Sequence, residues 1–76
     1  NDTIEGNNGN DTIEGNNGND ILDGGQGDDT IRGGNNDDTI NGGEGDNTLY
    51  GDGGNDLINV GLGTNLIYGN DNDDQI

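Results

Sequence analysis

A nine-residue period runs through the whole chain without interruption. An aliphatic residue occurs at every ninth position: Ile4, Ile13, Leu22, Ile31, Ile40, Leu49, Ile58, Ile67 and Ile76. An acid or its amide lies two residues before each aliphatic residue, and every interval contains glycine. A fixed period of this kind indicates a repeat architecture in which each unit stacks on its neighbours.

Each repeat divides into a turn and a short strand. Counted from its leading glycine, the first six positions are mostly Gly, Asn and Asp, which favour turns. The last three positions place one aliphatic residue between two outward-facing ones, the first usually Thr, as in a short strand. A helix is disfavoured because nine residues do not fit a 3.6-residue period. The pattern therefore predicts a solenoid of short strands and turns.

Composition alone predicts a disordered chain. Hydrophobic residues make up 21% of the sequence, and the formal net charge is -16. One buried aliphatic residue contributes roughly 1.5–3 kcal/mol, whereas ordering the backbone costs roughly 1–2 kcal/mol for each of the nine residues. We therefore expect a bound divalent cation to neutralise the charge and to contribute folding free energy.

Composition also argues against several classes of function. Without Cys or His, the chain has no disulfide and lacks the usual zinc ligands. Arg32 is the only basic residue, so binding to nucleic acid is not expected. No apolar run approaches the ~20 residues of a membrane span. The absence of Ser, Cys, His and Lys removes the common nucleophiles and bases, so the sequence does not indicate an enzyme.

The repeat resembles the calcium-binding nonapeptide GGxGxDxUx of the RTX (repeats-in-toxin, haemolysin-type) family, in which U is aliphatic. Residues 24–32, GGQGDDTIR, satisfy the motif in full, and the resemblance extends over all 76 residues. It implies an all-β fold, a right-handed parallel β-roll solenoid. Two nonapeptides, or 18 residues, would make one turn, with calcium between stacked turns.

The resemblance also implies the calcium ligands. Side-chain ligands are expected at position six, from Asp2, Asp11, Asp20, Asp29, Asp38, Asp56 and Asp74. Asn47 and Asn65 replace the acid, so their sites are expected to be weak or absent, unless the amide oxygen still binds the ion. Main-chain ligands are expected around Gly6, Gly9, Gly15, Gly18, Gly24, Gly27, Gly33, Gly42, Gly45, Gly51, Gly54 and Gly69.

An 18-residue turn sorts these positions onto two edges. One edge would stack Asp2, Asp20, Asp38, Asp56 and Asp74, and the other would stack Asp11, Asp29, Asn47 and Asn65. Complete loop pairs would then be 20/38, 38/56, 56/74, 11/29, 29/47 and 47/65, giving up to about six ions. The 47/65 pair is expected to be weakest, and Val60 replaces its leading glycine. Valine there would strain the loop if the position needs a positive φ.

The outward positions carry further expectations. In one column Glu14 would lie beside Arg32, and Tyr50 beside Tyr68, so the first two can pair and the last two can stack. An apolar excess gathers near the C-terminus at Leu57, Val60, Leu62 and Leu66. This excess would either extend the core or form an interface.

Taken together, residues 1–76 are expected to be a single array and a fragment of a longer protein. The leading hypothesis is a calcium-binding repeat module of a secreted or cell-surface protein that folds on binding extracellular Ca²⁺. The alternative is a structural repeat of an extracellular filament or adhesin, with end-to-end or lateral self-association. Ice binding is a third hypothesis, and the irregular loop columns argue against it.

Overall fold

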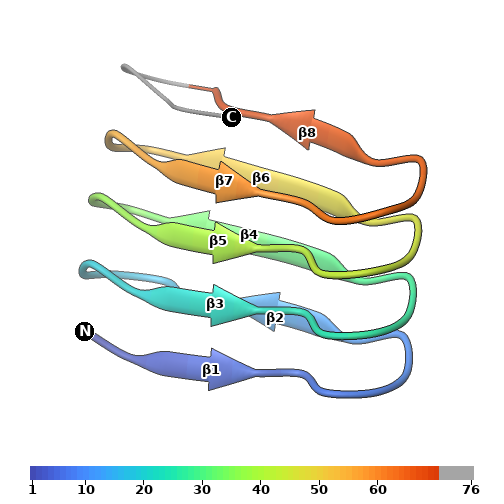
Figure 1. Ribbon diagram of the computed structural model, residues 1–76. Helices are drawn as coiled ribbons and strands as arrows, with labels where there is room; N and C mark the ends of the chain where they lie inside the picture. Colours follow the sequence, from blue (N-terminus) through green and yellow to red (C-terminus); the bar gives the residue numbers. More distant parts are fainter. Residues whose placement is uncertain (71–76) are drawn as a thin grey trace.

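The computed structural model describes residues 1–70 as a stack of eight short β-strands without a helix (Figure 1). The strands are β1 (Thr3–Glu5), β2 (Thr12–Glu14), β3 (Ile21–Asp23), β4 (Thr30–Gly34), β5 (Thr39–Asn41), β6 (Thr48–Asp52), β7 (Leu57–Asn59) and β8 (Leu66–Tyr68). Residues 1–70 contain no helix that is long and apolar enough to cross a membrane. The expectations for Asp74 and Ile76 lie outside the described residues.

The strands form two four-stranded parallel sheets, which confirms the predicted solenoid. One sheet has the order β1-β3-β5-β7 and the other β2-β4-β6-β8. Every pairing joins residues that are 18 apart in the sequence, as in Ile40 with Ile58 and Ile31 with Leu49. In Figure 1 the chain passes along one sheet, turns, returns along the other and so climbs by one strand per sheet in each turn.

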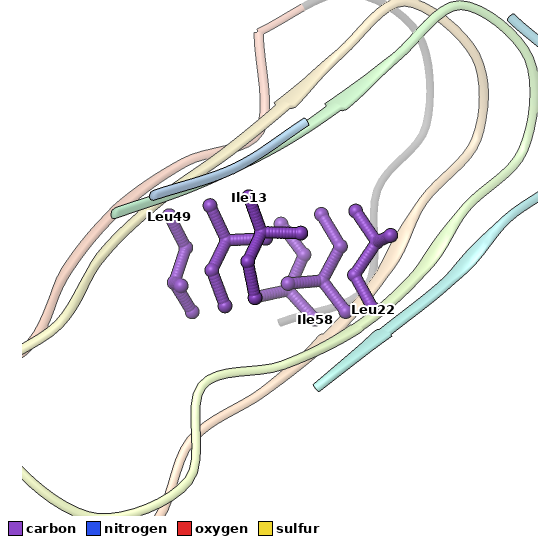
Figure 2. Close-up of a cluster of buried hydrophobic side chains, with 6 residues drawn as sticks. Ile13, Leu22, Leu49 and Ile58 are labelled. Carbon is purple, nitrogen blue, oxygen red and sulfur yellow. The ribbon is translucent and has the colours of Figure 1, made fainter. Parts of the chain in front are cut away.

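The repeated aliphatic residues form the core between the two sheets, as predicted. Six of them are buried: Ile13, Leu22, Ile31, Ile40, Leu49 and Ile58. Ile4 and Ile67 pack against this cluster and are partly buried. Figure 2 shows the six side chains in a single row between the two layers of backbone. With one inward-facing aliphatic side chain per strand, the core is only one residue wide.

The outward columns agree in part with the sequence. The rings of Tyr50 and Tyr68 stack, with centroids 5.0 Å apart and planes 9° apart. The Arg32 guanidinium lies 4.2 Å from the centre of the Tyr50 ring. Its ion pair is a long one of 3.9 Å with Asp52, rather than the expected pair with Glu14.

The C-terminal apolar residues do not extend the core. Leu57, Val60, Leu62 and Leu66 are all exposed, and Leu62 retains 79% of its accessible surface.

Candidate metal centre

The turns between the sheets stack along two edges of the solenoid. Loops 6–11, 24–29, 42–47 and 60–65 form the first, here called the Asn47 edge, which lies at the right of Figure 1. Loops 15–20, 33–38 and 51–56 form the opposite Asp38 edge. The structure thus brings the position-six residues into the two columns that the 18-residue spacing predicts.

From the second turn of the stack onward, one side-chain oxygen of each position-six residue accepts a hydrogen bond from the turn before it. The backbone N–H of Asp20 donates to Oδ1 of Asp38 at 2.8 Å, and that of Asp38 donates to Oδ1 of Asp56 at 2.8 Å. The same contact joins the N–H of Asp11 to Oδ1 of Asp29 at 2.8 Å on the other edge. Oδ1 of Asp29, Asp38 and Asp56 therefore already accepts a bond from the preceding turn.

The second carboxylate oxygen is buried and lacks a partner. This holds for Oδ2 of Asp11, Asp20, Asp29 and Asp38. A buried carboxylate oxygen without a donor is costly, because it has lost its water and gained nothing in return. Four such atoms at equivalent places in a stack indicate that a positively charged group belongs beside them.

In the loops that carry an aspartate at position six, the leading glycine opens a space next to this oxygen. A side-chain carbon added to Gly33 would lie 2.6 Å from Oδ2 of Asp38 and 2.9 Å from the carbonyl oxygen of Gly51 in the next turn. A carbon added to Gly24 would likewise meet Oδ2 of Asp29 at 2.5 Å and the Gly42 carbonyl oxygen at 2.8 Å. A carboxylate oxygen and a carbonyl oxygen thus face the same small space between successive turns.

Glycine is needed at the leading position for space and not for its φ angle. The positive φ angles occur at the second and fourth positions of the loops, as at Gly25 (87°) and Gly27 (117°), and at none of the described leading glycines. The condition under which Val60 was expected to strain its loop, a positive φ at the leading position, is therefore not met. The side chain of Val60 instead enters the space beside Gly42, the leading glycine of the preceding loop. There Cγ1 of Val60 lies 3.3 Å from the position of a side-chain carbon added to Gly42.

Asn47 reveals which main-chain oxygens face this space. Its Nδ2 donates to the carbonyl oxygen of Gly42 at 2.9 Å and lies 3.4 Å from that of Gly43 and 3.5 Å from that of Gly45. These residues hold positions one, two and four of the loop. The sequence places main-chain ligands around the glycines of positions one and four, and the amide of Asn47 adds the carbonyl of position two as a named candidate.

Main-chain oxygens have to supply much of any ligand shell. No group of three or more acidic side chains converges on a metal-sized space anywhere in residues 1–70. Ca²⁺ takes six to eight oxygen ligands and accepts backbone carbonyls readily. The residues present fit such an ion: an unpaired carboxylate oxygen, carbonyl oxygens of the same loop and a carbonyl oxygen of the next turn.

Burial raises the pKa of one position-six acid on each edge. Desolvation raises the pKa of Asp38 from 3.8 to about 6, against the lowering effect of the hydrogen bond from the Asp20 backbone. The charges of Asp56, Asp20 and Asp37 raise it further. The pKa of Asp29 is raised by the same dominant cause, loss of solvent. Neighbouring carboxylates also raise both pKa values, so the charged forms of these two acids favour a positively charged neighbour.

Comparison with known proteins identifies the repeat. The RTX calcium-binding nonapeptide repeat family matches the chain in four copies, over residues 1–31, 32–67 and 50–76. This repeat is a calcium-binding structural unit rather than a catalytic domain. No curated protein and no solved structure shows significant similarity to the chain.

Proposed function

Because the chain belongs to the RTX calcium-binding nonapeptide repeat family, we propose that it is a module of a secreted or cell-surface protein that folds when it binds Ca²⁺. The observation that carries the proposal is the row of buried, unpartnered Oδ2 atoms. Those of Asp20 and Asp38 lie on one edge, and those of Asp11 and Asp29 lie on the other.

Each site would lie between two successive loops of one edge. The position-six Oδ2 would bind the ion together with carbonyl oxygens at positions one, two and four of its own loop. The leading carbonyl of the next loop, such as that of Gly51 beside Asp38, would complete one side. A bound Ca²⁺ supplies the positive charge that these oxygens lack. The 56/74 pair includes Asp74, which lies outside the described residues.

Calcium would bind the folded chain and would thereby contribute to its folding free energy. Within residues 1–70 only six aliphatic side chains are buried, and the net charge of the chain is -16. An ion that binds only the folded stack shifts the equilibrium toward it by mass action. Millimolar calcium outside cells matches the affinity of weak extracellular calcium modules, which supports an extracellular location.

Circular dichroism with and without calcium tests this proposal. In chelator the chain is expected to give the spectrum of a disordered chain, and millimolar Ca²⁺ should produce a cooperative gain of β signal. Mg²⁺ at the same concentration is the matched control and should act poorly, because it demands a tighter octahedral shell. A full β signal in chelator would contradict calcium-driven folding.

A structural role in an extracellular filament or adhesin is the second proposal. It is supported by the exposed apolar side chains of the last described turn, such as Leu62 and Leu66. Light scattering on the calcium-loaded chain separates the two proposals. A mass that grows with protein concentration supports self-association, and a constant single-chain mass argues against it.

A further inference from the structure

The amide of Asn47 has its orientation fixed by the turn before it. The backbone N–H of Asp29 donates to Oδ1 of Asn47 at 2.7 Å, in the same way that other N–H groups donate to aspartate Oδ1 atoms. A flipped amide would point its NH₂ group at this N–H and its oxygen at three carbonyl oxygens. Both contacts would be repulsive, so the nitrogen must face the loop.

The nitrogen of Asn47 therefore stands where an aspartate has its unpaired Oδ2. It donates toward the carbonyl oxygens of Gly42, Gly43 and Gly45. An amide nitrogen that carries two hydrogens is a donor and has no capacity to bind a cation. Oδ2 of Asp29 is an acceptor without a donor. The Nδ2 group of Asn47, in the same place, donates a hydrogen bond to a carbonyl oxygen of its loop. Asn65 follows the same pattern more loosely, with Nδ2 3.4 Å from the Gly63 carbonyl oxygen.

The next loop on this edge is also altered. Val60 replaces the leading glycine, and its methyl group lies beside Gly42, where other turns present a carbonyl oxygen. Gly61 lacks the positive φ found at the second position of the preceding loops, as at Gly25 and Gly43. Its N–H donates to the Gly43 carbonyl at 3.0 Å, a bond made from the third position in earlier turns, as by Glu44 to Gly25.

We propose that Asn47 determines where calcium binds by closing its own loop without an ion. The amide nitrogen replaces the cation, and Val60 fills the remaining space, so the 47/65 position is a calcium-free turn in an otherwise calcium-loaded stack. This inference rests on the proposed function for the other sites. Asn47 does not bind an ion of its own loop through the neutral oxygen, because that oxygen points to the backbone N–H of Asp29 in the preceding turn while the nitrogen faces the loop.

The test is a gain-of-site variant with charge-matched controls. Asn47→Asp, alone and with Val60→Gly, restores the carboxylate and the space. Asn41→Asp adds the same charge in the same turn at a position where Asp23 is accommodated 18 residues earlier. Both side chains there accept a backbone N–H two residues on. The reverse pair is Asp29→Asn, which introduces the amide, and Asp23→Asn as its control.

Calorimetric titration with CaCl₂ gives the first readout. Asn47→Asp/Val60→Gly should bind one more ion per chain than the wild type, Asp29→Asn one fewer, and both controls the wild-type number. The second readout is metal-free folding, driven in chelator by trimethylamine oxide, which favours compact states. Asn47→Asp should need more osmolyte than Asn41→Asp, and Asp29→Asn less than Asp23→Asn.

The ion count and the osmolyte measurement distinguish failure of the proposed function from failure of this inference. If the wild type binds no calcium but the osmolyte order holds, the proposed function fails and the role of the amide stands. If Asn47→Asp/Val60→Gly binds no additional ion while the wild type binds several, the inference is overturned. It is also overturned if Asn47→Asp folds in osmolyte as easily as Asn41→Asp. Should no variant fold in osmolyte, the ion count alone decides.

Discussion

Each position-six aspartate uses its two oxygens for different purposes. Oδ1 of Asp38 accepts the N–H of Asp20 and fixes the spacing of the stack, whereas Oδ2 faces the space beside Gly33. The first contact needs only an acceptor, so Asp and Asn serve equally well. The second distinguishes them, because an acid presents an acceptor there and an amide presents a donor. The choice between the two residues thus changes what the loop presents to a cation without changing the stacking hydrogen bond.

A methyl group at a leading glycine is expected to block the adjacent site. In Gly33→Ala the new carbon would lie 2.6 Å from Oδ2 of Asp38, closer than side-chain carbons approach oxygen. Overpacking of this kind costs about 1–3 kcal/mol, and the calcium concentration at the folding midpoint should rise. Gly9→Ala is the control: Gly9 has a φ of 102°, but nothing lies within 4 Å of the added carbon. A smaller effect for Gly33→Ala than for Gly9→Ala would show that φ, not space, selects glycine.

At the residue scale the sequence predicts the positions of the acids, but it does not predict why the leading position needs glycine. The column of acids follows from the period alone. The reason for glycine at the leading position does not, because it depends on a carbonyl oxygen 18 residues away, such as that of Gly51 beside Gly33. The direction of the Asn47 amide depends in the same way on the N–H of Asp29 in the preceding turn. Contacts across turns are set by the fold, so no local pattern reveals them.

The strands are too short to be stable alone. Each of six is three residues long, and only the second residue of each strand points into the core. Parallel pairing with the strand 18 residues away supplies the missing contacts, as Ile40 shows between Leu22 and Ile58. The alternation of inward and outward residues made this register predictable, since a slip of one residue would expose every aliphatic side chain. The five-residue lengths of β4 and β6 were not predicted.

A charge in the core is expected to abolish calcium-dependent folding. Ile40 is completely buried between the sheets, so Ile40→Asp would place an unpaired carboxylate among aliphatic side chains. The calcium-induced β signal in circular dichroism should be lost at any calcium concentration. Thr39→Asp is the matched control, because it adds the same charge one residue away on the exposed face of β5. Retention of the β signal by Ile40→Asp would mean that the core is not formed by this column.

The whole molecule combines a thin core with a large negative charge. Two columns of buried acids run along its edges, and the charges of Asp20 and Asp56 both raise the pKa of Asp38 between them. Either a cation or protons can relieve this repulsion. The general architecture was predictable because it repeats, and the replacements at Asn47 and Asn65 already predict from the sequence that the two edges differ in calcium binding. Metal-free folding is therefore expected to depend on pH.

Acid should partly replace calcium. Asp38 keeps a pKa of 3.8 in the unfolded chain and has one of about 6 when buried, so the folded chain binds its proton more tightly. The resulting stabilisation is complete below about pH 4 and is lost as the pH rises through about 6. In chelator, the β signal should therefore increase on acidification from pH 7 to pH 4. Asp38→Asn should weaken this dependence by removing the titrating group.

Asp46→Asn is the control for the loss of one negative charge. Asp46 is exposed, its Oδ1 accepts the N–H of Thr64, and Asn10 makes the equivalent bond to Asp28 two turns earlier. An amide at position 46 should therefore leave the pH dependence nearly as it is in the wild type. If acidification gives no gain of β signal, or if both variants flatten the curve equally, burial of Asp38 is not the cause. The effect would then reflect the net charge of -16 as a whole.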